Sequence, residues 1–175
     1  MLLGRWSGYF ISVTLDDALD SIAPRLLRYC RARTGGEFSL AEEIAQESLT
    51  ALVQRWSRFG PPNSPEAFTF AIARRRAWRA TLRRRLLVSV EHLLDHRDQR
   101  ADPEGQAIAR QECERAFRAL RRLPRGEREA LLLVAVGELD NDTAARVLNV
   151  SGAALKMRVM RAKRRLAGLM EDDVG

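Results

Sequence analysis

The chain has 175 residues, enough for one ordinary domain or two small ones, and 46% of them are hydrophobic, which excludes a globally disordered protein. The net charge of +7 and the pI near 10.5 suit a polyanionic partner, although a basic surface can also serve solubility alone. The two cysteines, Cys30 and Cys113, form no CxxC pattern, so neither a disulfide framework nor a thiolate metal site is indicated. The uncharged stretch 6–15 is too short and too polar to span a bilayer and does not resemble a signal peptide. We therefore expect a cytoplasmic protein without membrane insertion.

Leu, Ala and Arg dominate the sequence, and runs of β-branched residues are rare, which favours helices. We predict an all-α fold with two small helical domains joined by a flexible linker: residues 1–87, a linker at 88–105, and residues 106–175. Residues 1–15 remain unplaced within the first domain. Hydrophobic periodicity predicts helices near residues 16–33, 39–58, 65–86, 106–122, 125–136, 141–148 and 152–169.

The predicted linker lacks helical periodicity and contains proline, glycine and several charged residues. His92 and His96 have the spacing of metal ligands on a helix, but no third ligand lies near them in the sequence. We interpret them as solvated linker histidines, and we expect neither a metal nor another cofactor.

Charge is distributed unevenly along the chain. Residues 35–54 contain four glutamates and no Lys or Arg, whereas residues 74–85 contain seven arginines and no acid. A second basic block, residues 156–165, contains six cations and no acid. Two basic blocks separated by a neutral segment suggest two contacts with a polyanion.

The predicted helix 39–58 separates apolar from polar residues. Its apolar stripe consists of Leu40, Ile44, Leu49, Leu52, Val53 and Trp56. Its other face carries Glu43, Gln46, Glu47, Thr50 and Gln54. That polar face is either a docking surface or an ordinary solvated one.

Residues 140–166 have the pattern of a helix-turn-helix. Asp140 can cap a short helix, Asn149 tolerates the left-handed conformation of a tight turn, and Ser151 can cap the next helix. That second helix is predicted to bury Leu155, Val159, Ala162 and Leu166 and to expose its cations. A basic helix after a short turn suits the DNA major groove, although a basic helix packed on a small bundle would give the same pattern.

Several stretches resemble bacterial RNA polymerase sigma factors. Residues 119–133 (ALRRLPRGEREALLL), followed by LNVS at 148–151 and LKMRV at 155–159, resemble sigma region 4. Residues 41–48 (AEEIAQES) resemble region 2.2, and WSRF at 56–59 with FTFAIAR at 68–74 resembles regions 2.3 and 2.4. The resemblance covers about residues 22–86 and 110–169 and fits the compact extracytoplasmic-function (ECF) group.

The resemblance implies a non-catalytic factor that binds core RNA polymerase and directs promoter-specific initiation by recognising −10 and −35 elements and assisting DNA melting. Its implied partners are the β′ clamp helices and β flap of the polymerase, promoter DNA and an anti-sigma factor. The polymerase-binding residues it implies are Glu43, Gln46 and Glu47.

The candidate −10 contacts lie around the loop 58–65 and on the helix after it. The arginines of the helix 65–86 would hold phosphates, and Phe59 or Phe68 could stack on an unstacked base. Either aromatic ring could instead belong to the core, as we expect for Trp56 and Trp78. The full set is Arg58, Phe59, Asn63, Phe68, Arg74, Arg75 and Arg79.

The candidate −35 contacts lie on the second helix of the helix-turn-helix. Lys156, Arg158 and Arg161 are expected to read bases, and Arg164 and Arg165 to hold phosphates. The full set is Ser151, Ala153, Lys156, Met157, Arg158, Arg161, Arg164 and Arg165.

The sequence also departs from the family pattern. Asn149 replaces a frequent glycine, Ala153-Ala154 replaces Gly-Thr, and Met157 replaces a small polar residue, so the promoter preference cannot be transferred. In the helix 65–86, Arg75, Arg76 and Arg79 replace a frequent Asn, apolar residue and acid.

Three other functions are compatible with parts of the sequence. A helix-turn-helix regulator acting without polymerase explains the second half but gives the Glu43–Glu47 face no role. A sigma-like protein that only sequesters a partner explains both halves. An enzyme is not supported, because the chain lacks a Gly-rich phosphate loop, an HExxH motif and a nucleophile motif.

Overall fold

The computed structural model describes residues 14–88 and 105–172, and every regular element in those ranges is a helix. The predicted all-α class is confirmed, with helix ends that differ from the predicted ones by a few residues. The predicted linker, with His92 and His96, and the N-terminal extension fall on residues 89–104 and 1–13, outside the described residues. The elements are α1 (Leu15–Thr34), α2 (Phe38–Phe59), α3 (Pro65–Val88), α4 (Gly105–Arg122), α5 (Arg125–Leu131), the wider turn η1 (Leu132–Val136), α6 (Asn141–Leu148) and α7 (Gly152–Asp172).

Local signals mark where the first three helices begin and end. Thr14 and Asp17 form a reciprocal capping box at the start of α1, and Gly35 ends that helix in the left-handed conformation, with φ of 75°. Gly60 ends α2 with φ of 76°, and the prolines that follow prevent the helix from continuing. The Ser64 hydroxyl accepts a hydrogen bond from the backbone N–H of Ala67 and starts α3.

The predicted helix 125–136 is interrupted. It winds as an α-helix only to Leu131 and then widens into η1, where the backbone N–H of Gly137 donates to the carbonyl of Leu132. The wider turn accompanies the burial of three consecutive leucines: Leu131 packs into a small cluster with Leu123 and Ala162, and the next two into the main core. The 3.6-residue periodicity of an α-helix places consecutive residues on different faces, so it does not predict that this helix widens where consecutive leucines are all buried.

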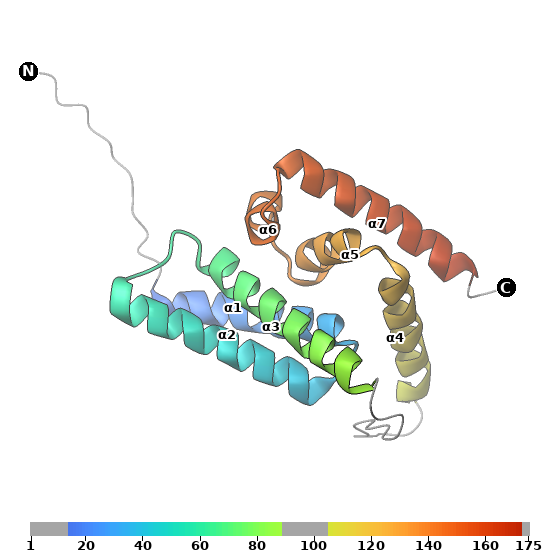
Figure 1. Ribbon diagram of the computed structural model, residues 1–175, viewed down its shortest axis with the longest axis horizontal. Coiled ribbons are helices and arrows are strands. Elements are labelled where there is room, and N and C mark those ends of the chain that lie inside the picture. The colour runs from blue at the N-terminus through green and yellow to red at the C-terminus, as the bar shows by residue number, and fades with distance from the viewer. Residues whose placement is uncertain (1–13, 89–104, 173–175) are drawn as a thin grey trace, which may run out of the picture.

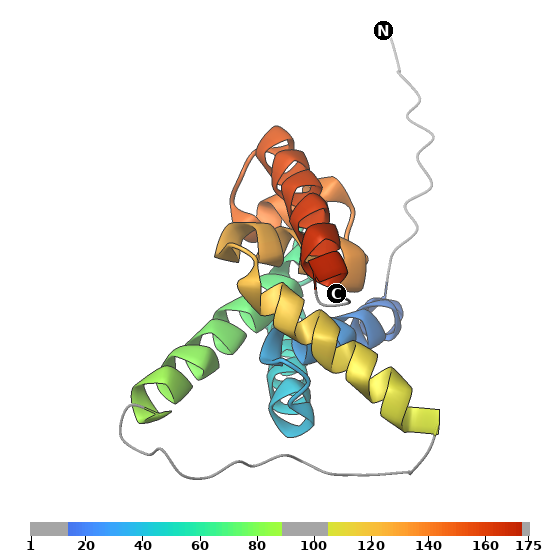
Figure 2. The ribbon, with the colours of Figure 1, turned by 90° about the vertical axis from the view of Figure 1, so that its right-hand side faces the viewer.

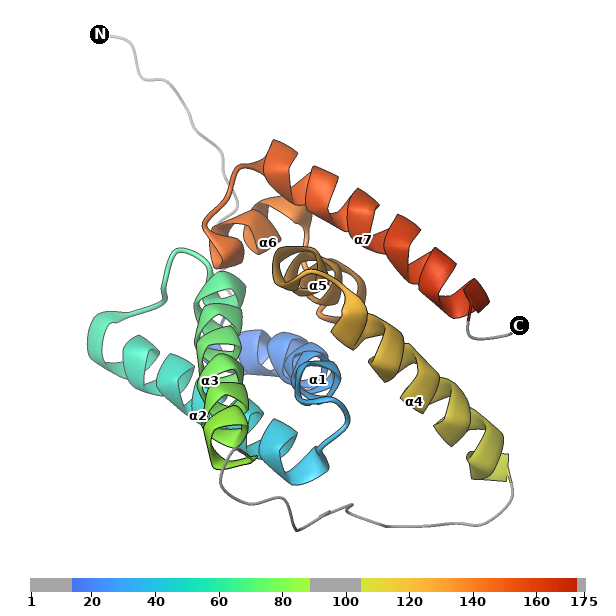
Figure 3. The same cartoon turned by 45° about the vertical axis from the view of Figure 1, so that its right-hand side comes forward.

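The helices form two groups that pack against each other (Figure 1). α1, α2 and α3 form a three-helix bundle, and α5, α6 and α7 form the helix-turn-helix domain, with α4 against α7. η1 packs on α1, and α6 packs on α3. Figure 2 shows the helices of the second group, orange to red, above the first three helices, blue to green. α7 lies on the outside of the second group, away from α2 (Figure 3). None of the described helices is both long and apolar enough to cross a membrane.

One hydrophobic core joins the two groups. It contains Ile22 and Leu26 of α1, Phe70 of α3, and Leu133 and Leu155 from the second half of the chain, all nearly inaccessible to solvent. The described residues thus form two helical domains in direct contact. The exact domain boundaries, 1–87 and 106–175, stay a prediction.

Candidate DNA-binding and polymerase-binding surfaces

The turn between α6 and α7 has the backbone geometry of a helix-turn-helix. The Asp140 carboxylate accepts a hydrogen bond from the backbone N–H of Thr143 at 2.9 Å, and its bonds with Thr143 lower the pKa of Asp140. Asn149 ends α6 with a left-handed φ of 53°. The Ser151 hydroxyl accepts from the backbone N–H of Ala154 at 3.2 Å and caps α7. The three predicted turn residues are confirmed in their roles.

The rotation of α7 about its axis is set by its buried residues. Leu155 and Ala162 are fully buried, Val159 packs half-buried against the main core, and Leu166 packs on the smaller cluster. Because these four residues share one face, the opposite face is turned to solvent. The predicted −35 contacts that are exposed are Ser151, Ala153, Lys156, Met157, Arg161, Arg164 and Arg165.

Two of the predicted −35 contacts touch α5 within the same domain. Arg158 is half-buried, and its guanidinium carbon lies 3.6 Å from the position that a Cβ on Gly126 would take. Arg165 forms an ion pair with Glu127, with 3.3 Å between nitrogen and oxygen. A Cβ at position 126 would make only an ordinary van der Waals contact with the Arg158 guanidinium, so this contact does not require a glycine.

The outward face of α2 is acidic. Glu43, Gln46 and Glu47 are exposed, whereas Ile44 and Leu52 are buried on the opposite side. The predicted separation of the two faces is confirmed. Glu47 also forms an ion pair with Arg76 of α3, so part of the charge of this face is compensated inside the domain.

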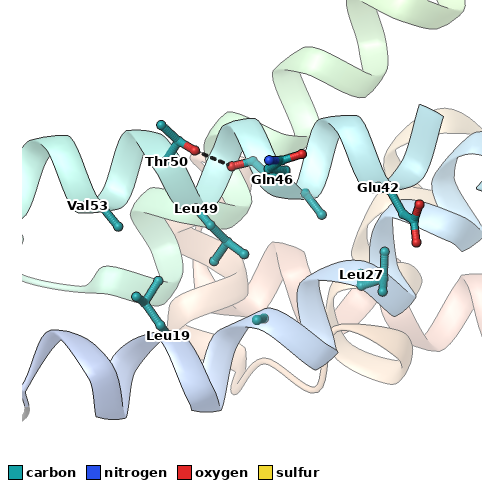
Figure 4. Close-up of a pocket in the computed structure, with 9 residues that line it drawn as sticks. Leu19, Leu27, Glu42, Gln46, Leu49, Thr50 and Val53 are labelled. Atoms are coloured by element: carbon teal, nitrogen blue, oxygen red, sulfur yellow. Dashed lines mark hydrogen bonds between the residues drawn. The ribbon is translucent and has the colours of Figure 1, made fainter. Parts of the chain in front are cut away.

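An apolar groove lies beside this acidic face, between α1 and α2 (Figure 4). It has a volume of about 600 Å³. Leu19 of α1 faces Leu49 of α2 across it, and Leu27 of α1 lies near Glu42 at the other end. On the α2 side of the groove, the backbone carbonyl of Gln46 accepts a hydrogen bond from the Thr50 hydroxyl at 2.9 Å. The remaining lining residues are Ala23, Glu42, Ala45 and Val53. The groove offers apolar surface next to carboxylates, which suits an amphipathic basic segment.

The loop after α2 presents an aromatic ring to solvent. Phe59 is 74% exposed, and the guanidinium of Arg55 lies over its ring at 5.2 Å. The predicted neighbours Arg58 and Asn63 are exposed as well. Phe68, in contrast, is half-buried and packs against the main core, so Phe59 is the ring available for stacking.

The arginines at the middle of α3 differ in accessibility. Arg75 and Arg79 are exposed, and Arg74 is half-buried. The tryptophans expected in the core are only partly buried: Trp56 packs against the main core, and Trp78 lies under the guanidinium of Arg125, 3.4 Å from the ring centre. None of these positions is an observed DNA contact, and the −10 assignments stay predictions.

Sequence reasoning missed two features of these surfaces. The α1 side of the groove could have been found from the spacing of Leu19, Ala23 and Leu27, which places them on one helix face. The buried ion pair between Arg33 of α1 and Glu129 of α5 carries no local signal, because its two residues lie 96 positions apart.

Two family models match the chain: Sigma-70 region 2 over residues 19–86 and Sigma-70, region 4 over residues 113–166. The chain is 32% identical over 166 residues to the ECF RNA polymerase sigma factor ShbA of Streptomyces griseus, covering 89% of this chain and 86% of ShbA. It is 36% identical over 160 residues to the ECF RNA polymerase sigma factor SigD of Mycobacterium tuberculosis, covering 87% of this chain and 74% of SigD.

Two solved structures share the fold. They are the sigma factor RpoE of Bartonella quintana in complex with the anti-sigma factor NepR, and CnrH in complex with the cytosolic domain of CnrY. Both have a TM-score of 0.67, with sequence identities of 20% and 23%. The matches cover 89% of this chain and 96% of RpoE, and 91% of this chain and 88% of CnrH.

A helix-turn-helix domain packed on a second helical domain with an acidic outward face defines a two-domain DNA-binding transcription factor. The chain belongs to the ECF RNA polymerase sigma factors. It is a sigma factor that binds core RNA polymerase for transcription initiation. A helix-turn-helix regulator acting without polymerase is not favoured, because the family match extends over region 2 as well as region 4.

Proposed function

We propose that three surfaces divide the work of this sigma factor. The acidic face of α2 docks on the β′ clamp helices, the exposed face of α7 reads the −35 element, and the loop after α2 with the arginines of α3 engages the −10 element. The observation that carries the proposal is the presence of an acidic and a basic outward face on separate helices of one chain. An acidic face repels DNA and therefore suits a protein partner.

Docking would combine charge with apolar contact. Glu43, Gln46 and Glu47 supply polar contacts to a basic partner, and the groove lined by Leu19 and Leu49 accepts its apolar side chains. Interfaces gain most of their binding energy from such partly apolar pockets, while charged rims steer the encounter. Region 4 would contact the β flap, as the family resemblance implies.

Promoter opening would use Phe59. Capturing an unstacked base offsets an unstacking cost of about a few kcal/mol, and stacking on an aromatic ring contributes roughly 1–3 kcal/mol per base. The high exposure of Phe59 and its position beside Arg58 and Asn63 support this role. Arg74, Arg75 and Arg79 would hold the neighbouring phosphates.

We further propose that the protein acts in the cytoplasm without catalysing a reaction itself, and that an anti-sigma factor regulates it. The structure of RpoE of Bartonella quintana contains the anti-sigma factor NepR, and that of CnrH contains the cytosolic domain of CnrY. This chain shares the fold of RpoE and CnrH.

Run-off transcription with core polymerase on a library of genomic fragments tests the proposed function. Transcripts that depend on the added protein and share upstream sequences at two positions are expected. Co-purification with core polymerase but no transcript would support a protein that only sequesters its partner. DNA binding without co-purification would instead support the polymerase-independent regulator.

A further inference from the structure

A second hollow lies on the other side of the acidic face, between α2 and α3, and it is polar where the groove is apolar. It has a volume of about 310 Å³. Its lining residues are Gln46, Glu47, Thr50, Ala51, Gln54 and Arg76. Gln46 and Thr50 line the apolar groove as well, so they form the ridge between the two hollows. Glu47 and Arg76 are the charged residues among those that line the polar hollow. The proposed docking face is therefore bordered by a positive charge on its α3 side.

Arg76 is directed toward α2, unlike its neighbours on α3. Arg75 and Arg79 are exposed, whereas Arg76 is half-buried and its Nη1 donates a hydrogen bond to Oε2 of Glu47. The side chains of Arg76 and Glu47 are 38% and 45% exposed, so the pair lies at the surface and an incoming group can reach it. In the free protein, Arg76 thus occupies part of a carboxylate that is proposed to bind the polymerase.

A cation at this position acts against a basic partner in two ways. It competes for the Glu47 carboxylate, because one of the two acceptor oxygens already holds the guanidinium. It also repels any positive group that approaches Glu47. Both effects weaken the attraction between the acidic face and a basic partner. An exposed ion pair contributes little to the stability of a fold, so the larger consequence of Arg76 lies in docking.

We infer that Arg76 lowers the affinity of this sigma factor for core RNA polymerase by pairing with Glu47 in the free protein. The inference rests on the proposed function, since it takes the acidic face of α2 as the polymerase-docking surface. Docking exchanges the internal pair for a pair with the partner, and the net gain is the difference between the two. A lower affinity keeps the polymerase unsaturated, so its occupancy follows the amount of the factor.

Removal of the Arg76 charge should tighten docking. Arg76→Met keeps an unbranched side chain that favours helices, and it should lower the Kd for core polymerase by up to about fivefold, the range of an exposed ion pair. Arg76→Lys keeps the positive charge and should stay close to wild type. Arg83→Met is the matched control, because Arg83 is exposed and lies seven residues further along the same face of α3. That spacing is about 10 Å along the helix axis, roughly a Debye length at physiological salt.

A double-mutant cycle assigns the effect to the pair itself. Glu47→Gln should weaken docking, and in that background Arg76→Met should tighten docking much less than in wild type, because the ion pair no longer exists. Arg83→Met should change the affinity by the same factor with and without Glu47. A mere gain in overall negative charge would instead make Arg76→Met tighten docking equally in both backgrounds.

The Kd is measured by titrating the labelled full chain with core polymerase and following fluorescence anisotropy. The label is attached to the exposed Cys113, while Cys30 is buried and its pKa is raised to about 12, so it does not react at neutral pH. A titration is needed, because co-purification at high concentration saturates and does not resolve a fivefold change. Circular dichroism verifies that each variant is helical. The tightening by Arg76→Met should shrink as salt is added, because salt screens exposed charges.

The inference is overturned if helical Arg76→Met binds core polymerase no more tightly than wild type, or if it tightens docking equally in the Glu47→Gln background. Weaker binding of Arg76→Met would also overturn it and would show that Arg76 itself supports docking. The proposed function survives these outcomes whenever Glu47→Gln weakens docking. If Glu47→Gln binds like wild type, the docking face is wrong and the inference fails with it.

Discussion

The two arginine-rich helices of this protein look alike as sequence but differ in their surroundings. On α7, Lys156, Arg161 and Arg164 lie on an exposed face whose opposite side is anchored by buried residues. On α3, Arg76 is paired with Glu47 and Arg74 is half-buried. A run of positive charge therefore stays available to a polyanion mainly where the fold places few acids beside it, and on α7 one of the arginines, Arg165, pairs with Glu127. In the first domain, part of the positive charge of α3 is neutralised by an ion pair within the domain. In the second domain, most of the positive charge of α7 is exposed to solvent.

The largest effect is expected at the acidic face of the first domain. Glu43→Arg together with Glu47→Arg should abolish binding to core polymerase, because two attractive contacts become repulsive ones while the buried face of α2 is untouched. Co-purification with core polymerase measures it, and circular dichroism should show unchanged helicity. Arg76→Ala is the control, since it removes the partner of Glu47 but keeps the acidic face. Normal stoichiometry in the double variant would show that the polymerase docks elsewhere.

The basic face of the second domain should separate base reading from phosphate binding. Arg158→Ala should cost about 1–3 kcal/mol on the best promoter duplex and much less on a scrambled one, if it pairs with a guanine. Arg164→Ala should weaken both duplexes by a similar factor and lower the salt slope by roughly one unit.

The measurement uses the full chain across a salt series, because the second domain shares its core with the first. Equal weakening of both duplexes by Arg158→Ala would assign Arg158 to phosphate or to its contact with Gly126. Base reading would then fall to Lys156, Met157 or Arg161, which are exposed without rearrangement.

The loop between α2 and α3 should act after DNA binding. Phe59→Ala should slow promoter opening about tenfold, the loss of one base–aromatic stack, while closed-complex binding stays nearly intact. Permanganate reactivity near the start site follows the opening. Phe38→Ala is a matched control at the other end of α2, because Phe38 is also exposed and also lies under an arginine, Arg31. Equal rates in both variants would place the base pocket elsewhere.

The smallest effect concerns the two cysteines, which again differ between the domains. Cys113 is exposed, whereas burial raises the pKa of Cys30 from 9.0 to about 12. The Cys30 thiol of the unfolded chain ionises near pH 9, whereas the buried thiol of the folded chain stays protonated up to about pH 12. The free energy of unfolding is therefore unaffected below pH 9 and falls as the pH rises from 9 toward 12. At pH 9.5 the loss is about 0.8 kcal/mol. Chemical denaturation of Cys30→Ala should show a shallower decline between pH 8 and 9.5, and an identical slope would contradict it.

Much of the fold and part of the candidate site could be predicted from the sequence. The helix-turn-helix was predictable because Asp140, Asn149 and Ser151 make their capping hydrogen bonds with backbone groups no more than four residues away. The outward faces of α2 and α7 were predictable because the spacing of the apolar residues shows which side of each helix is buried. The polar residues on the opposite side must then face solvent. The exposure of Phe59 could not be predicted from the sequence, since a ring at a helix end can turn toward the core or away from it.

The sequence by itself determined the helices, their caps, the family and the two outward faces, because each rests on interactions between residues close along the chain or on motif resemblance. Only the tertiary structure decided the widened turn η1, the Arg76–Glu47 pair and the burial of Arg33 against Glu129. These pairs join residues 29 and 96 positions apart. Any of the many arginines could satisfy a given glutamate by charge alone, so the choice depends on which helices pack together.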